Sequence, residues 1–250
     1  MAVAFSGGAD STLVAKIAFD ELGERAVAVT VKSPLFSASE LAQAKTIAKT
    51  IGIEHIVVSA DPLKDRAFSS NPPDRCYLCK LDILKRIKGV ADERGLNKVI
   101  DGSNADDQED YRPGLKAKDE LGVRSPLAEI GLGKKDVREV SRILKLTTAK
   151  KIPSPCLASR IPYGETITEE KLRMIEESEE FLKAKGFEQV RVRVHGSSAR
   201  IEVSPSDVPR LASPGARIPV IKKLKSLGFT YVSLDLEGYR TGSMNEVLGR

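Results

Sequence analysis

Ser6-Gly7-Gly8-Ala9-Asp10-Ser11 is the stretch that decides the fold of this chain, and it directly follows the apolar run Ala2-Val3-Ala4-Phe5. Two consecutive glycines let the backbone turn sharply and bring its N–H groups close to an anion, because no Cβ stands in the way. The apolar residues between 11 and 18 indicate the first turns of a helix packed on the strand, so that its N-terminal amides face the loop. The stretch predicts a strand, a loop that binds a di- or triphosphate, and a helix.

The loop differs from the Walker phosphate-binding loop. A Walker loop has four residues between its glycines and then a lysine, whereas here no lysine follows the glycines until Lys16, inside the helix. Without a lysine aimed at the terminal phosphates, the loop is suited to holding a pyrophosphate leaving group while the α-phosphorus is attacked. A tight turn between a strand and a helix is the alternative. The position at a strand end, with Asp10 and two hydroxyls, favours phosphate.

The motif resembles the SGGxDS loop of the PP-loop ATP pyrophosphatases, whose members adenylate a substrate oxygen. The resemblance implies that ATP binds at this loop together with Mg²⁺. The residues that it assigns to ATP are Ser6, Gly7, Gly8, Asp10 and Ser11.

The composition is typical of a globular enzyme. The 250 residues carry a formal charge of +5, and basic and acidic side chains are interleaved in most segments. This mild, mixed charge and the lack of tryptophan argue against a nucleic-acid footprint. No apolar stretch is long enough to cross a membrane and no charged-then-apolar leader precedes the loop, so we expect a cytoplasmic protein.

Strands and helices alternate along residues 1–152. Apolar runs at 26–31, 56–58 and 98–100 predict strands, and the segments between them have helical spacing. Ser37 and Glu40 have the spacing of a capping box, which predicts the start of one helix. The alternation predicts an α/β fold with a doubly wound parallel sheet, which in the light of the resemblance is of the adenine nucleotide alpha hydrolase-like type. Ligands of such sheets bind at the carboxyl ends of the strands.

Two polar loops, 101–107 and 110–114, follow the strand at 98–100 and are therefore expected at the same edge as the glycine loop. We expect Gly102 to admit the nucleotide against the backbone and Arg112 to contact phosphate. The neighbouring acidic residues are typical of a solvated surface loop.

Proline and serine gather at 153–166, which predicts a hinge between two domains. Residues 1–152 form the predicted ATP pyrophosphatase domain, and residues 167–250 form a smaller α+β domain for substrate binding or oligomerisation. In the smaller domain, 190–195 and 199–203 alternate between apolar and polar residues, which predicts half-buried strands that pair as a hairpin.

Three cysteines are the candidates for metal or sulfur chemistry. Cys76 and Cys79 lie at the start of a predicted helix, and Cys156 lies in the hinge. An odd number without a secretory signal argues against a disulfide framework. The residues leave three explanations open: a redox dithiol, a zinc site completed by His55 or His195, and an iron–sulfur cluster. A cubane cluster held by three thiolates leaves one iron open to bind hydrosulfide.

Several motifs, spread over essentially the whole chain, resemble the LarE family. They are SGGADS, DYRPGLKA at 110–117, SPCLASRIPYG at 154–164, RVR at 191–193 and the segment 234–242. The family consists of ATP-dependent sulfurtransferases that make the pincer ligand of the nickel cofactor of lactate racemase. The resemblance implies that a carboxylate of pyridinium-3,5-biscarboxylic acid mononucleotide is adenylated and that sulfur then displaces AMP to give a thiocarboxylate.

The resemblance also bears on the source of sulfur. Family members with one cysteine, at the position of Cys156, sacrifice its sulfur, whereas members that also have the pair matching Cys76 and Cys79 resemble cluster enzymes. All three cysteines are present here, which implies a [4Fe-4S] cluster that carries the transferred sulfide. Sacrificial donation from Cys156 and tRNA thiolation by a related enzyme are the alternatives, and the physiological source of sulfide stays open.

The family binds the phosphate of its substrate beside the hinge cysteine and forms symmetric homo-oligomers. The matching residues are Ser159, Arg160, Arg191 and Arg193. Residues two apart on a strand share one face, so the two strand arginines are expected to point the same way. Without the resemblance, such a pair is typical of a solvated outer face.

Overall fold

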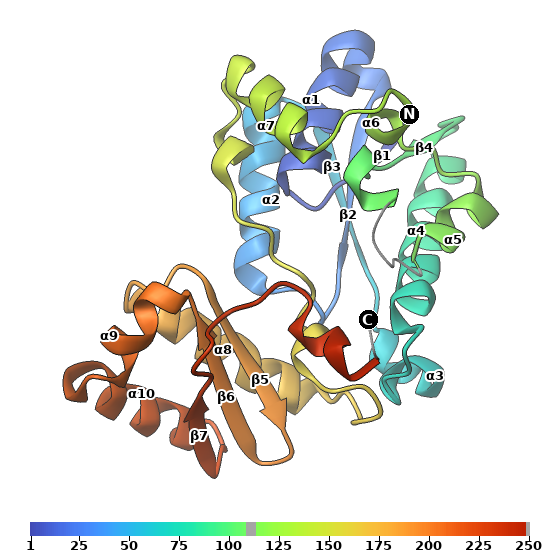
Figure 1. The fold of residues 1–250 in the computed structure, drawn as a ribbon. Helices are drawn as coiled ribbons and strands as arrows, with labels where there is room; N and C mark the ends of the chain where they lie inside the picture. Colours follow the sequence, from blue (N-terminus) through green and yellow to red (C-terminus); the bar gives the residue numbers. More distant parts are fainter. Residues whose placement is uncertain (109–113, 249–250) are drawn as a thin grey trace. The chain divides into compact units, whose positions relative to one another are not determined.

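The computed structural model describes residues 1–108 and 114–248, so the predicted phosphate ligand Arg112 lies outside the described residues. The chain divides into two compact units, drawn in Figure 1. Unit 1 comprises Met1–Phe68 and Pro72–Pro153, and unit 2 comprises Ser69–Asn71 and Ser154–Arg250. Cys156 therefore belongs to unit 2, together with all of the segment 153–166 except Pro153.

Unit 1 is built on a four-stranded parallel sheet with the order β3-β2-β1-β4. Its strands are β1 (Ala2–Ala4), β2 (Val27–Lys32), β3 (Glu54–Ser59) and β4 (Val99–Ile100). β1 pairs with β2 on one side and with β4 on the other, so the loop that follows β1 leaves from the middle of the carboxyl edge. The predicted parallel α/β sheet is confirmed.

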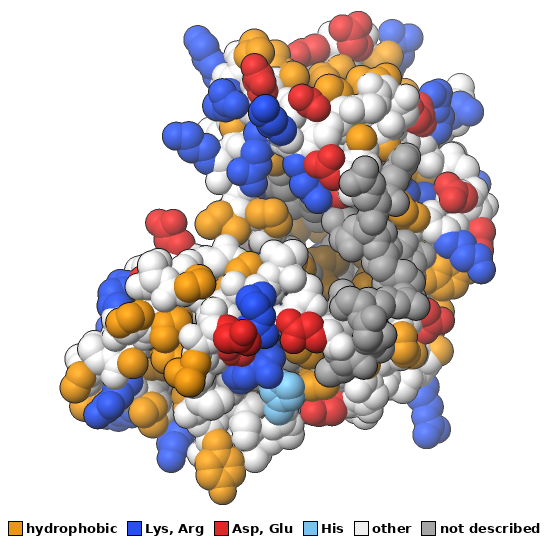
Figure 2. All heavy atoms as spheres, viewed as in Figure 1, with side chains coloured by type: hydrophobic (Ala, Val, Ile, Leu, Met, Phe, Trp, Pro, Cys, Tyr) orange, Lys and Arg blue, Asp and Glu red, His pale blue; other side chains and the backbone are white. Residues whose placement is uncertain are grey.

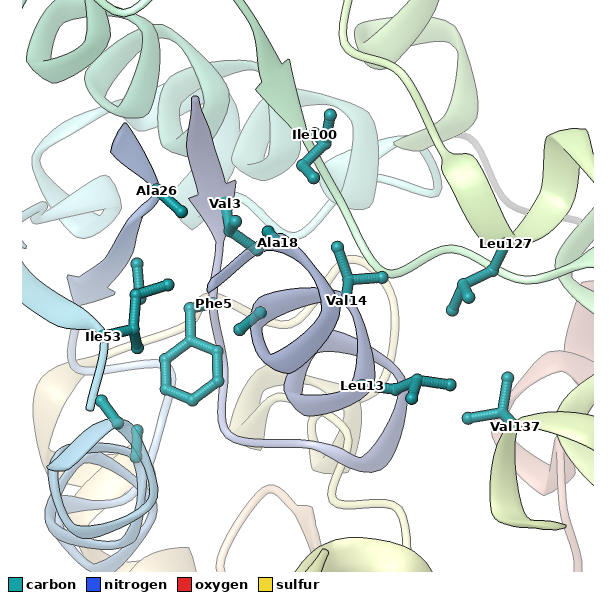
Figure 3. Packing of buried hydrophobic residues seen from close by; sticks show 14 residues of the cluster. Val3, Phe5, Leu13, Val14, Ala18, Ala26, Ile53, Ile100, Leu127 and Val137 are labelled. Atoms are coloured by element: carbon teal, nitrogen blue, oxygen red, sulfur yellow. The ribbon is translucent and has the colours of Figure 1, made fainter. Parts of the chain in front are cut away.

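Helices cover both faces of this sheet. The helices that begin in unit 1 are α1 (Ala9–Leu22), α2 (Ala38–Ile51), α3 (Arg66–Ser69), α4 (Arg75–Glu93), α5 (Gly114–Leu121), α6 (Pro126–Glu129) and α7 (Lys134–Ile143). One apolar cluster joins the sheet to α1, α2 and α7, and a second joins it to α4. In the first cluster Leu13 of α1 points towards Val137 of α7, and Phe5 lies beside Ile53 (Figure 3). The doubly wound arrangement follows from these two clusters.

The start of α2 is fixed by the predicted capping box. The Glu40 backbone N–H donates to Ser37 Oγ at 3.2 Å, and the Ser37 N–H donates to Glu40 Oε2 at 3.3 Å. This reciprocal pair satisfies two of the backbone donors that a helix start leaves without partners. The helix start predicted from Ser37 and Glu40 is therefore confirmed.

Unit 2 contains a smaller mixed sheet with the order β5-β6-β7. β5 (Val190–His195) and β6 (Ser198–Val203) form the predicted antiparallel hairpin, and β7 (Tyr231–Leu234) pairs with β6 in parallel. The helices of this unit are α8 (Glu169–Ala184), α9 (Val208–Ala212) and α10 (Pro214–Ser226). Thr168 caps α8 by accepting from the Lys171 N–H.

The interpretation of β5 as a half-buried strand is wrong. Arg191 and Arg193 are only 4% and 5% exposed, so neither belongs to a solvated outer face. Carboxylates from two neighbouring elements, Glu179 of α8 and Glu202 of β6, are buried beside them. The alternating pattern is the same for a polar face that meets water and for one that meets buried acids, so the sequence pattern alone did not separate them.

Basic and acidic side chains are interspersed on the face shown in Figure 2, as the mixed charge along the sequence predicts. Over residues 1–108 and 114–248, none of the helices combines the length and the apolar character needed to span a bilayer.

Candidate active site

The loop between β1 and α1 has the conformation of an anion-binding loop. Gly7 has a φ of +69°, and a Cβ placed there would lie 3.0 Å from Ala44 Cα, so only glycine fits without strain. Gly8 stands directly before α1, whose first N–H groups have no partner within the helix. The hydroxyls of Ser6 and Ser11 lie 3.1 Å apart, and the Gly8 N–H donates to Ser6 Oγ at 3.3 Å. The two serines brace the loop, and the start of α1 supplies its amides.

The loop after β4 packs directly on this cradle. A Cβ on Gly102 would lie 2.6 Å from the Ser11 backbone nitrogen, and Asn104 Nδ2 donates to Asp10 Oδ1 at 3.0 Å. Gly102 and the cradle therefore touch backbone to backbone, and Asn104 fixes one oxygen of the Asp10 carboxylate. The second oxygen of that carboxylate is the type of ligand that Mg²⁺ prefers.

A lysine far along the chain also reaches the cradle. Lys151 Nζ donates to the Gly7 carbonyl oxygen at 2.9 Å, across 144 positions of sequence. Burial lowers the pKa of this ammonium group, while the negative charge of Glu40 acts in the opposite direction. Sequence reasoning missed Lys151, because no local pattern links it to the glycine loop.

A buried carboxylate ties the end of β4 to two helices. Asp101 is 2% exposed, and its oxygens accept from Ser125 Oγ at 2.7 Å and from Ser103 Oγ at 2.9 Å. Lys80 Nζ of α4 lies 3.2 Å from it, and Lys118 Nζ of α5 lies 3.8 Å from it. Burial by itself raises the pKa of Asp101, but the two ammonium groups and the hydrogen bonds outweigh it and leave the pKa lowered. Asp101 is therefore an anion that organises the strand end.

The cysteine pair lies at the beginning of α4. Cys76 is the second residue of this helix, and Cys79 follows three positions later, so both are on one side of the helix start. Cys76 is exposed and Cys79 is partly exposed. Lys80, the next residue, makes the contact with Asp101, which ties this helix start to the loop after β4. Among the described residues, no three His, Cys, Asp or Glu side chains gather as a metal site.

The third cysteine lies in a short loop of unit 2 that a buried arginine holds in place. Arg160 is completely buried and makes a two-pronged ion pair with Glu179, with distances of 2.9 and 3.0 Å. Its Nη1 donates to the carbonyl oxygens of Pro155 and Cys156 at 2.7 and 3.0 Å, and to Ser159 Oγ at 2.9 Å. Cys156 directly precedes the 3₁₀ helix Leu157–Arg160. Arg160 therefore fixes the backbone on which the thiol is carried.

The two arginines of β5 belong to the same buried charge cluster. Arg193 pairs with Glu202 at 2.8 and 3.0 Å and also donates to the Ser159 carbonyl at 3.0 Å. Arg191 donates to the carbonyl of Val190 and lies 5.2 Å from the centre of the Tyr239 ring. Burial, followed by repulsion from the Arg160 guanidinium, lowers the pKa of Arg191. The negative charge of Glu179 acts on this pKa in the opposite direction.

The two histidines considered as zinc ligands lie in different units and have different surroundings. Thr30 Oγ1 donates to the Phe5 carbonyl and lies 2.7 Å from His55 Nε2, so the imidazole donates from Nε2 and braces the strand end before the cradle. His195 lies in unit 2 at the end of β5, where burial and the charge of Arg200 lower its pKa. His55 is thus engaged through Nε2 inside unit 1.

Comparisons with known proteins agree with this geometry. Residues 1–92 match the NAD synthase family model. The chain is 44% identical over 246 residues to an uncharacterised protein of Synechocystis sp., covering 98% of this chain and 92% of that one. It is 40% identical over 247 residues to the pyridinium-3,5-bisthiocarboxylic acid mononucleotide synthase of Lactiplantibacillus plantarum, covering 98% and 89%. An uncharacterised protein of Methanocaldococcus jannaschii is 34% identical over 239 residues, covering 96% and 90%.

The parallel sheet, the SGGADS cradle and the match to NAD synthases define an ATP-using enzyme of the PP-loop class. At 40% identity over nearly its full length, the chain belongs to the LarE family, the pyridinium-3,5-bisthiocarboxylic acid mononucleotide synthases.

Proposed function

We propose that this enzyme adenylates a carboxylate of pyridinium-3,5-biscarboxylic acid mononucleotide and converts it to a thiocarboxylate. The product named for the Lactiplantibacillus plantarum relative, a bisthiocarboxylic acid mononucleotide, supports this choice of substrate. In the first step the carboxylate oxygen attacks the α-phosphorus of ATP, and pyrophosphate leaves. In the second step hydrosulfide attacks the carbonyl carbon of the acyl adenylate, AMP leaves, and one proton is released.

The cradle serves the first step. The N–H groups at the start of α1, with Ser6, Gly7 and Gly8, are suited to the phosphate oxygens of ATP, because amide donors and the positive end of the helix dipole meet there. Asp10, held by Asn104, is the proposed Mg²⁺ ligand. Ser11 completes the ATP contacts, and Gly102 keeps the neighbouring loop close to the nucleotide.

The presence of three cysteines is the observation that carries the proposed sulfur source. Thiolates suit iron–sulfur clusters, and Cys76, which is exposed, and Cys79, which is partly exposed, lie on one side of a helix start where they would hold such a cluster. We propose Cys156 of unit 2 as the third thiolate ligand. When bound, a [4Fe-4S] cluster with three protein thiolates leaves one iron able to carry sulfide. In this proposal Arg160 holds the Cys156 backbone in place through its hydrogen bond to the Cys156 carbonyl oxygen.

The buried arginine cluster is our proposed site for the phosphate of the substrate. Three guanidinium groups, from Arg160, Arg191 and Arg193, face two carboxylates, from Glu179 and Glu202. An anionic phosphate relieves the repulsion that lowers the pKa of Arg191. Because Ser159 Oγ lies beside Arg160, it is the proposed neutral donor at the same site.

Anaerobic reconstitution with iron and sulfide tests the sulfur source. We expect a brown protein with about four irons per chain, as a [4Fe-4S] cluster requires, and a strong loss of colour in Cys76→Ser, Cys79→Ser and Cys156→Ser. A colourless wild-type protein contradicts the cluster. Mass spectrometry after one turnover separates the sacrificial route, because loss of the elements of hydrogen sulfide from Cys156 contradicts catalytic transfer. Release of pyrophosphate that depends on the mononucleotide, and not on tRNA, tests the substrate.

A further inference from the structure

The cradle lacks a lysine of its own, yet an ammonium group lies against it. Lys151 Nζ is 2.9 Å from the carbonyl oxygen of Gly7, the residue at the sharp turn of the loop. The lysine stands immediately after the 3₁₀ helix Thr147–Lys150, near the end of unit 1. In a Walker loop the lysine follows the glycines directly. Here the ammonium group belongs to a residue near the other end of unit 1.

The segment that carries Lys151 is firmly anchored. Thr148 and Ala149 are 2% and 7% exposed, and the Lys151 N–H donates to the Thr148 carbonyl at 2.9 Å. Leu146, just before this segment, packs on the apolar cluster of α1 and donates its N–H to the Ser141 carbonyl at 2.8 Å. The backbone that presents Lys151 is therefore held by the same core that holds the cradle.

The ammonium group has N–H donors that the described residues do not use. An ammonium group carries three N–H donors, and within the described part of the chain the only acceptor bonded to Lys151 Nζ is the neutral Gly7 carbonyl. Among these residues no carboxylate lies within ion-pairing distance of it, and Glu40 acts on it only from further away. A half-buried cation of this kind is costly unless an anion joins it.

We propose that Lys151 binds the β- and γ-phosphate oxygens of ATP at the cradle and stabilises the pyrophosphate that leaves during adenylation. The inference rests on the proposed adenylation step and adds the cation that this loop sequence omits. Negative charge grows on the pyrophosphate as its bond to the α-phosphorus breaks, and a fixed ammonium group lowers the barrier to that step. AMP lacks the β- and γ-phosphates, so Lys151 should not contribute to its binding affinity.

Calorimetric titration of the full-length protein with ATP, pyrophosphate and AMP tests the proposal. For Lys151→Met we expect about 10- to 100-fold weaker binding of ATP and of pyrophosphate, which corresponds to about 1.4–2.8 kcal/mol, with AMP affinity within about threefold of wild type. Lys151→Arg, which keeps the charge, should recover part of the loss. The matched control is Lys150→Met, since Lys150 is exposed and adjacent and should bind all three ligands like wild type.

Two results overturn the inference. One is unchanged ATP and pyrophosphate affinity in Lys151→Met. The other is an equal loss for ATP and AMP together with a lower melting temperature, because that pattern means the lysine only supports the Gly7 carbonyl. Failure of the proposed function looks different, because the wild-type protein itself then binds ATP without releasing pyrophosphate when the mononucleotide is added.

Discussion

A Cβ added to Gly102 would lie 2.6 Å from the backbone nitrogen of Ser11, a distance that no real side chain tolerates. The loop after β4 and the start of α1 thus meet backbone to backbone, and neither side has a flexible atom that can move away. We expect Gly102→Ala to displace the cradle, to destabilise the protein by about 1–3 kcal/mol and to weaken ATP binding more than tenfold.

Gly89→Ala is the matched control for this substitution. Gly89 lies inside α4, and a Cβ there would meet nothing within 4 Å. Alanine in a helix interior should stabilise the protein by about 0.5–1 kcal/mol relative to glycine. Urea unfolding and ATP titration of both variants make the comparison. Normal ATP binding by Gly102→Ala shows that the close approach has no role in shaping the cradle.

Glu179 is expected to be the most sensitive position behind the Cys156 loop. It neutralises the buried Arg160, which in turn holds the carbonyl of Cys156. Burial raises the pKa of Glu179, but Arg160 outweighs this and leaves it lowered, so the carboxylate is ionised. Glu179→Gln removes the carboxylate charge that faces the buried Arg160 guanidinium, and we expect a loss of about 3 kcal/mol of unfolding free energy. Glu180→Gln, one residue along on the exposed side of α8, should cost less than about 0.5 kcal/mol.

Amide hydrogen exchange gives this prediction a local readout. The Val192 N–H donates to Glu179 Oε1 at 3.1 Å. Its protection should therefore fall in Glu179→Gln and stay unchanged in Glu180→Gln. Equal protection in the two variants means that Glu179 does not hold α8 to β5.

Asp101 should be required for the helix that carries the cysteine pair. It faces Lys80 of α4 and Lys118 of α5, which is 6% exposed. Burial lowers the pKa of Lys118, and the charge of Asp101 acts in the opposite direction. Asp101→Asn leaves these ammonium groups without their shared anion, so we expect a loss of about 3–5 kcal/mol. Asp92→Asn, on the exposed side of α4, is the control and should be nearly neutral. Circular dichroism during urea unfolding measures both, and equal stabilities contradict the assignment.

The sequence was informative where local chemistry determines the backbone. Two glycines after an apolar run predicted the turn before α1, and Ser37 with Glu40 predicted the start of α2, because each signal acts within a few residues. The parallel sheet followed from the alternation of strands and helices. These features need no knowledge of which distant segment packs on which.

The sequence was uninformative where distant residues meet. Arg191 and Arg193 had the pattern of an exposed face, because their burial depends on Glu179 and Glu202 from other elements. Lys151 had no pattern at all, since its partner at Gly7 stands 144 positions away. Charged residues that pair across the fold leave no periodic signal, so the acidic partners of these arginines and the distant lysine emerged only from the structure.

His55 provides a prediction about pH. Burial, helped by the charge of Lys45, lowers its pKa below the ordinary value of 6.5. The unfolded chain therefore binds a proton at higher pH than the folded protein does, so the stability associated with neutral His55 is present above about pH 6.5 and is lost as the pH falls. Protonation adds a proton at Nδ1 and leaves the donation from Nε2 to Thr30 in place, so the loss comes from burial of the charged ring and from repulsion by Lys45. Titration of the two histidine signals by NMR, with His55→Gln as the assignment control, measures this pKa directly. Because the glutamine amide keeps a donor near Thr30 and does not titrate, His55→Gln should lose less stability than wild type between pH 7 and pH 5. A His55 pKa at or above 6.5, or equal losses in the two proteins, contradicts this account of the strand end.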